Sequence, residues 1–153
     1  EYLASHGYVV MHVPVKGTKQ YELDYEGLGL DSQVKDYEFA LNILRKEFSS
    51  ITDVAATIGF SFGSQSAVAL AIRNKSVNAV ISYDGGIGSF FGAQLLSNQA
   101  YYRELDVMAP ILHLYNPADP YTDLTWFNSI RHADRFLAGM KNMQIMMELR
   151  GEA

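Results

Sequence analysis

Ser61 stands in a setting that suits a nucleophile, at the centre of the pentapeptide Gly59-Phe60-Ser61-Phe62-Gly63. The apolar residues before it (54–58, VAATI) predict a strand, and the alanine-rich residues after it (64–73, SQSAVALAIR) predict a helix. The glycines let the chain bend sharply and let the two elements pack closely. A hydroxyl on such a bend, beside a helix N-terminus that favours negative charge, predicts attack on an acyl carbon. The alternative is a tight turn whose serine only caps the helix.

A serine hydroxyl needs an imidazole base and a carboxylate that orients the base. Asp84 follows the predicted strand 79–83, and Asp119 follows the predicted strand 111–115, so both are expected at the same sheet edge as Ser61. We favour Asp84, because it lies directly at its strand end and two glycines follow it. Asp119 is the alternative acid. For both Asp84 and Asp119, the alternative is an aspartate that only starts its own turn.

The elements that must position these residues follow from apolar patterning. Continuous apolar runs predict five strands, at residues 8–13, 54–59, 79–83, 111–115 and 143–149. Residues 16–30 read as a loop, and helices are predicted at 31–48, 64–74, within 89–102 and at 124–138. Strands without polar alternation are typical of a sheet buried on both sides. The fold class is therefore α/β, a mostly parallel sheet with helices on both faces.

Composition narrows the possible functions. The chain has 153 residues, 48% of them hydrophobic, and a net charge of −5 with interspersed charges, so nothing indicates a nucleic-acid site. It lacks cysteine, which excludes disulfides and thiolate metal ligands. No run of 18 apolar residues predicts a membrane span. No His, Asp and Glu spacing suggests a metal site, and no cofactor is expected. Without repeats or linkers, residues 1–153 read as a single domain.

Four segments resemble the α/β-hydrolase superfamily, particularly serine esterases around dienelactone hydrolase and platelet-activating-factor acetylhydrolase. They are LASHGYVV (3–10), GFSFGS (59–64), SYDGG (82–86) and APILHLYN (109–116). The resemblance covers nearly the whole chain, although only the serine turn is specific. In acetylhydrolases of this kind the acid closes the strand after the nucleophile helix, which implies Asp84. In dienelactone hydrolases it follows the next strand, which implies Asp119 or, as a weaker alternative, Asp123.

The resemblance also implies where the base lies. In this superfamily the histidine follows the serine and the acid along the chain. His6 and His12 precede Ser61, His113 lies within a predicted strand, and His132 lies within a predicted helix. We therefore expect the base within a residue or two beyond Ala153, since LRGEA resembles the arginine-glycine turn before it. The domain then reads as incomplete at both ends, lacking N-terminal strands and the histidine loop.

The resemblance places one oxyanion donor on the backbone N–H of Phe62, the residue after the nucleophile. The second donor is expected from a loop before residue 8, outside the chain. The predicted function is a serine hydrolase that cleaves small carboxylic esters through an acyl-enzyme, with the fragment itself inactive. The alternatives are an acyltransferase with the same residues and a non-catalytic binding protein that keeps the fold. Nothing in the sequence fixes the oligomeric state.

Overall fold

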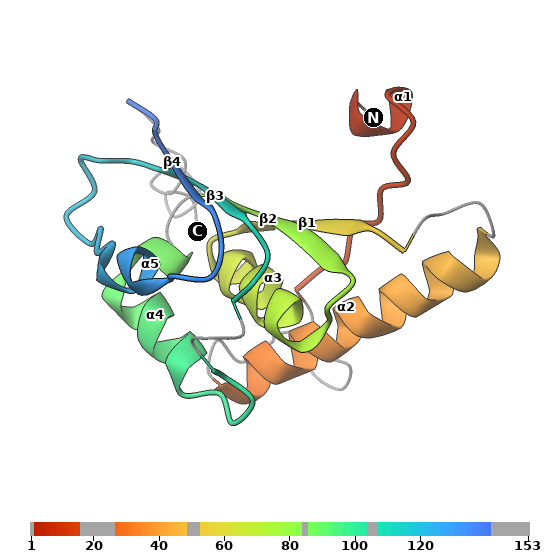
Figure 1. Cartoon of the computed structure of the whole chain (residues 1–153), viewed down its shortest axis with the longest axis horizontal. Helices are drawn as coiled ribbons and strands as arrows, with labels where there is room; N and C mark the ends of the chain where they lie inside the picture. Colours follow the sequence, from red (N-terminus) through yellow and green to blue (C-terminus); the bar gives the residue numbers. More distant parts are fainter. Residues whose placement is uncertain (1, 16–26, 49–52, 84–85, 104–106, 142–153) are drawn as a thin grey trace, which may run out of the picture.

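The computed structural model describes residues 2–15, 27–48, 53–83, 86–103 and 107–141, and Figure 1 labels its elements. The strands are β1 (Ala55–Phe60), β2 (Val77–Tyr83), β3 (Ile111–Tyr115) and β4 (Arg135–Gly139). The helices are α1 (Tyr2–Ser5), α2 (Gly27–Glu47), α3 (Phe62–Arg73), α4 (Phe90–Ser97) and α5 (Thr125–Ser129), with a 3₁₀ turn η1 (Gly86–Gly88). No helix in this described part of the chain is long and apolar enough to cross a membrane.

The strands form one parallel sheet in the order β1-β2-β3-β4. A helix lies in each connection: α3 follows β1, α4 follows β2 and α5 follows β3. Strands joined this way point in the same direction, so their carboxyl ends meet at one edge of the sheet. The predicted α/β class with a parallel sheet is confirmed, and the strands predicted at 54–59, 79–83 and 111–115 correspond to β1, β2 and β3.

Helix α3 forms the centre of the core. All its residues from Phe62 to Ile72 are buried, and it packs directly against β1 and β2. Ala67 and Ala71 are among these buried residues, and their small side chains let the helix lie close to the sheet. Thr57 on β1 donates a hydrogen bond from Oγ1 to the Ala67 carbonyl at 3.5 Å. The predicted second helix is thereby confirmed, beginning two residues earlier than expected.

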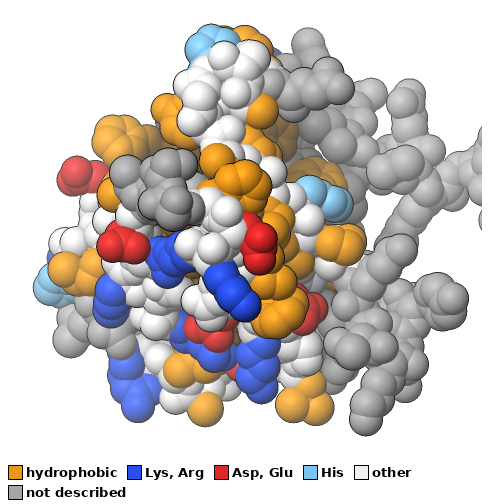
Figure 2. Space-filling model, turned by 90° about the vertical axis from the view of Figure 1, so that its right-hand side faces the viewer, with side chains coloured by type: hydrophobic (Ala, Val, Ile, Leu, Met, Phe, Trp, Pro, Cys, Tyr) orange, Lys and Arg blue, Asp and Glu red, His pale blue; other side chains and the backbone are white. Residues whose placement is uncertain are grey.

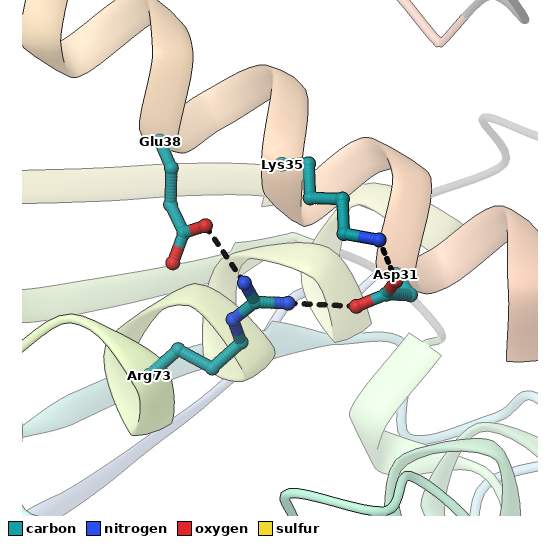
Figure 3. A network of polar contacts seen from close by, with 4 residues as sticks. All are labelled: Asp31, Lys35, Glu38 and Arg73. Carbon is teal, nitrogen blue, oxygen red and sulfur yellow. Dashed lines mark hydrogen bonds and ion pairs between the residues drawn. The ribbon is translucent and has the colours of Figure 1, made fainter.

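A charged cluster joins the far end of α3 to α2. The Arg73 guanidinium donates to Asp31 Oδ1 at 2.7 Å and to Glu38 Oε2 at 2.8 Å, and Lys35 pairs with the second oxygen of Asp31 (Figure 3). The guanidinium carbon of Arg73 also lies 5.0 Å from the ring centroid of Tyr101. Burial raises the pKa of Tyr101 to about 12, so its phenol stays neutral beside these charges. Through Arg73, the side chains of Asp31, Glu38 and Tyr101 hold the C-terminal turn of α3 in place.

Helices α2, α3, α4 and α5 lie on one side of the sheet in Figure 1, whereas the short helix α1 lies on the other side. On the face that α3 covers, strands β2 and β3 bury Val80, Ser82, Ile111 and His113, whereas Leu137 of β4 is 43% exposed. Side chains on the opposite face are exposed: Ile58 by 54%, Phe60 by 42% and Phe136 by 56%. On the opposite side, the described part of the chain contributes the four-residue helix α1, none of whose residues is buried. Figure 2 shows hydrophobic side chains at the surface, between mixed positive and negative ones, on one side of the molecule.

The prediction of one helix over residues 124–138 is wrong. Helix α5 ends at Ser129, and Ile130 has extended backbone angles of φ −59° and ψ 124°. The residues that follow form β4, in which Leu137 pairs with His113 and Gly139 with Tyr115. Pairing with β3 satisfies the backbone groups of β4, a tertiary gain that outweighs the local helical pattern.

Two N-terminal predictions also need correction. Residues 8–13 form no strand, and Tyr8, Val9, Val10 and Met11 are exposed, since no described strand pairs with this segment. Helix α2 begins at Gly27, not at residue 31 or 32, and its added turn buries Leu30. The predicted strand at 143–149 lies outside the described residues. Helix α4 confirms a helix within 89–102.

Candidate active site

Ser61 occupies a strained backbone position. Its φ of 50° and ψ of −118° make it the one non-glycine residue with positive φ in the described parts of the chain. Such angles are rare for a residue with a side chain, and they persist only where surrounding structure imposes them. Ser61 immediately follows β1, immediately precedes α3 and is partly exposed. The predicted strand, sharp turn and helix around this residue are therefore present.

Glycine is required at two positions beside Ser61. A Cβ atom on Gly59 would overlap the carbonyl of Gly63, so the end of β1 and the first turn of α3 are in backbone contact. A Cβ on Gly86, where φ is +46°, would overlap the carbonyl oxygen of Ser61. Gly63 is different, since a Cβ there would lie 4.0 Å from the Tyr37 hydroxyl, its nearest neighbour. Because Gly59 and Gly86 have no side chain, the end of β1, the first turn of α3 and η1 can lie in backbone contact.

The backbone N–H and carbonyl of Ser61 make hydrogen bonds to neighbouring residues, whereas its hydroxyl does not cap α3. Its N–H donates to the Tyr83 carbonyl at 3.0 Å, and its carbonyl accepts from the Ser64 N–H at 2.9 Å. Ser64 Oγ donates to the Gly59 carbonyl at 3.0 Å. Within the described residues, Ser61 Oγ makes no capping hydrogen bond to α3. The plainer reading of a helix-capping serine is therefore not supported.

The favoured acid, Asp84, lies outside the described residues. Its neighbour Tyr83 is described, and this last residue of β2 accepts the hydrogen bond from Ser61. The chain is described again from Gly86, whose Cα lies against Ser61. The two described residues on either side of Asp84 and Gly85, Tyr83 and Gly86, therefore both contact the serine turn.

The two other candidate acids take part in turns of their own. Asp119 accepts a hydrogen bond from the Tyr121 N–H at 2.9 Å, and Asp123 accepts one from the Thr125 N–H at 2.9 Å. Hydrogen bonds from the side chain and backbone of Thr125 lower the pKa of Asp123. Asp119 thus has the turn-starting role that its sequence setting suggested, and Asp123 has a similar one. In the described parts of the chain, no His, Asp and Glu side chains group as a metal site would need.

His113 is a buried structural residue. Its side chain is fully buried, its Nδ1 lies 2.8 Å from Ser82 Oγ, and its ring lies parallel to that of Tyr115. Burial lowers its pKa to about 4, while hydrogen bonding to Ser82 opposes the shift. A Cβ on Gly88 would overlap Nε2, so η1 lies directly over the ring. His113 is neutral at ordinary pH and packed beneath the edge that carries Ser61.

The remaining histidines are exposed. His6 binds the Tyr2 carbonyl within the first turn of the chain, at 2.9 Å from Nδ1. His12 is exposed in a segment without secondary structure. His132 lies in the bend between α5 and β4, instead of within the helix that the sequence predicts.

The loops that follow β2 and β3 are joined. The Asp123 N–H donates to the Gly88 carbonyl at 2.8 Å, and Ser89 forms an isolated antiparallel bridge with Thr122. Beneath this junction, Trp126 of α5 donates from Nε1 to the Tyr102 hydroxyl at 2.8 Å. The loops therefore form one connected rim beside the serine turn.

Sequence reasoning missed one residue at this edge, Gln65. It is buried on the first turn of α3, and its side-chain amide lies against the backbone of Ser61 and Phe62. The available signal was weak: a single glutamine within a helix of otherwise small or apolar residues.

Comparison with known families agrees with this geometry. Residues 1–146 match the family model of the dienelactone hydrolase family. The chain belongs to this family. Its fold is accordingly that of the α/β-hydrolase superfamily, and membership implies hydrolase activity. None of the curated proteins matches the chain.

Gly59→Ala should abolish stable folding, while Gly63→Ala should be tolerated. The first change forces a Cβ into backbone, which we expect to cost about 3 kcal/mol or more of unfolding free energy. The second adds a Cβ to the N-terminal turn of α3 where there is room, so the change should stay within about 1 kcal/mol. Urea denaturation of both variants checks this. Equal destabilisation would contradict the contact between β1 and α3.

His113 should make stability fall in mild acid. Because its folded pKa is lowered to about 4 from 6.5, the unfolded chain binds more protons between these values. The contribution of neutral His113 to the free energy of unfolding is fully present above pH 6.5. It is lost as the pH falls toward 4, by about 3 kcal/mol in total. Denaturation from pH 7.5 to 5 should show this slope in the wild type and in His132→Asn. It should be reduced in His113→Asn, and an unchanged slope there would refute the assignment.

Proposed function

We propose that the protein is a serine esterase that hydrolyses small carboxylic esters through an acyl-enzyme. Ser61 is the nucleophile, the Phe62 N–H is an oxyanion donor, and Asp84 orients a histidine base that we place beyond Ala153. Membership of the family implies hydrolase activity. The positive φ of Ser61 is the observation that supports its role as the nucleophile. A serine under this strain at the carboxyl edge of a parallel sheet presents its hydroxyl to solvent instead of to the helix.

In the first half of the reaction, Ser61 Oγ bonds to the acyl carbon while its proton passes to the histidine. The carbonyl π electrons move to oxygen, where the Phe62 N–H donates to the new negative charge. The charge returns as the bond to the alkoxy oxygen breaks, and that oxygen takes the proton from histidine. In the second half, water adds to the acyl carbon by the same route. Carboxylic acid leaves, and the proton returns to Ser61.

The surroundings of Ser61 suit this chemistry. Helix α3 begins at Phe62 and has 12 residues, so its N-terminal dipole end lies where the oxyanion would form. The turn is bonded to β2 through Tyr83 and backed by Gly86, so little reorganisation is needed when charge develops. The hydrogen bond from Ser61 to Tyr83 also favours Asp84 as the acid, because Asp84 is the next residue in the chain. Asp119 remains the alternative, and the family favours it.

In the natural full-length protein, a fluorophosphonate probe should label Ser61, as mapped by peptide mass spectrometry. Ser61→Ala should lose the label and lower the hydrolysis rate of p-nitrophenyl acetate at least about 10³-fold, because the nucleophile is gone. Ser97→Ala is the matched control, since this exposed hydroxyl donates to the Ala93 carbonyl within α4. An active Ser61→Ala enzyme, or no label on Ser61, would rule out the proposed mechanism.

The acid is identified by comparing Asp84→Asn with Asp119→Asn. Loss of the carboxylate that orients histidine should lower kcat by about 10³–10⁴-fold. We expect this loss in Asp84→Asn, while Asp119→Asn should stay within about tenfold of wild type, because only one turn is weakened. The reverse ranking would assign the acid to Asp119, as in the dienelactone hydrolases that the sequence resembles.

A further inference from the structure

Gln65 contacts the two carbonyls that follow the nucleophile. It lies one turn into α3, is 7% exposed, and points back toward the start of the helix. Because both neighbours are hydrogen-bond acceptors, the amide nitrogen must face them. In this orientation Nε2 donates to the Ser61 carbonyl at 2.8 Å and to the Phe62 carbonyl at 2.9 Å. A single side chain thus binds the backbone on both sides of Phe62.

The first of these bonds involves the proposed oxyanion donor. The Ser61 carbonyl and the Phe62 N–H belong to the same peptide group, which is planar and trans, so the two point in opposite directions. Whatever fixes the carbonyl also fixes the direction of the N–H. The Ser64 N–H, at 2.9 Å, and Gln65 both donate to this carbonyl, which satisfies its two lone pairs. Donation to the oxygen also polarises the peptide and strengthens its N–H as a donor.

The amide of Gln65 has little room to move. A Cβ on Gly92 of α4 would lie 2.7 Å from it, and a Cβ on Gly86 would lie 3.2 Å from it. Glycines at both positions therefore make the space that the amide fills. A buried amide held on several sides loses little further entropy when it holds a peptide plane in place.

We infer that Gln65 is a positioning residue for oxyanion stabilisation: its side-chain amide fixes the Ser61–Phe62 peptide so that the Phe62 N–H points toward the developing charge. Gln65 touches no reacting atom and acts only through this peptide. The inference rests on the proposed function, in which Ser61 is the nucleophile.

The test uses Gln65→Met and Gln65→Glu in the natural full-length protein. Methionine keeps the approximate volume without a donor, and glutamate keeps the shape but places a carboxylate against two carbonyls at pH 8. Gln33→Met is the matched control, because Gln33 is also buried but lies on α2. The active enzyme is counted by fluorophosphonate titration. The readouts are kcat and KM for p-nitrophenyl acetate, and the inhibition constant of an alkyl trifluoromethyl ketone, whose hemiketal oxyanion mimics the tetrahedral state.

We expect both Gln65 variants to lower kcat by about 10–100-fold per titrated site, with KM within about threefold, because the oxyanion exists only in the transition state. The inhibition constant of the ketone should rise by a similar factor. Gln33→Met should leave all three values unchanged. A merely structural role would reduce the number of labelled sites without changing kcat per site or the inhibition constant.

Wild-type values per titrated site in both Gln65 variants would overturn the inference and leave the serine esterase intact. Equal losses in Gln33→Met would overturn it as well, because the effect would then be one of general packing. If the wild type is not labelled at Ser61, the proposed function fails, and the inference fails with it.

Discussion

The close contact between the end of β1 and the first turn of α3 is the constraint on which the rest of this edge depends. Backbone meets backbone there, with only the hydrogens of Gly59 between the strand and the Gly63 carbonyl. To pass from one element to the other over so short a distance, the chain takes positive φ at Ser61. The strain is thus a result of packing, and the Ser61 side chain makes no capping hydrogen bond to α3.

The strained turn is held from several directions. Tyr83 bonds it to the neighbouring strand, and Gly86 closes over its carbonyl. His113 supports η1 from below, and the opposite end of α3 is held by Arg73 and its acidic partners on α2. A helix fixed at both ends cannot slide along the sheet to relieve the bend. This rigidity is what a preorganised site needs, since stabilising groups must already be in place when charge develops.

The sequence predicted the serine turn well because its signals are local: two glycines, an apolar strand and an alanine-rich helix stand next to one another. The same holds for β2 and β3, which are short apolar runs closed by turn residues. Pairing decisions were harder to predict. Residues 135–139 have a pattern that suits a helix, and only the free edge of β3 makes them a strand, whereas residues 8–13 look like a strand and have no described partner.

The site shows the same division between local and long-range information. The place of Ser61 at a strand end could be predicted, and so could the burial of His113. The contact of Gln65 with the Ser61 carbonyl could not, because it depends on space left by Gly86 and Gly92, which are distant in sequence. Asp84 and Asp119 were both placed after strands, and the described residues show the turn role of Asp119 alone. The choice between them stays a prediction.

The buried indole of Trp126 gives the rim of loops an optical reporter. It is the only tryptophan in the chain, it lies on α5, and its N–H is bonded to Tyr102. Its emission wavelength therefore reflects the polarity around one known helix, without contributions from elsewhere. A red shift on binding or mutation would mean that water has reached the ring, so intrinsic fluorescence can follow loosening of the rim independently of catalysis.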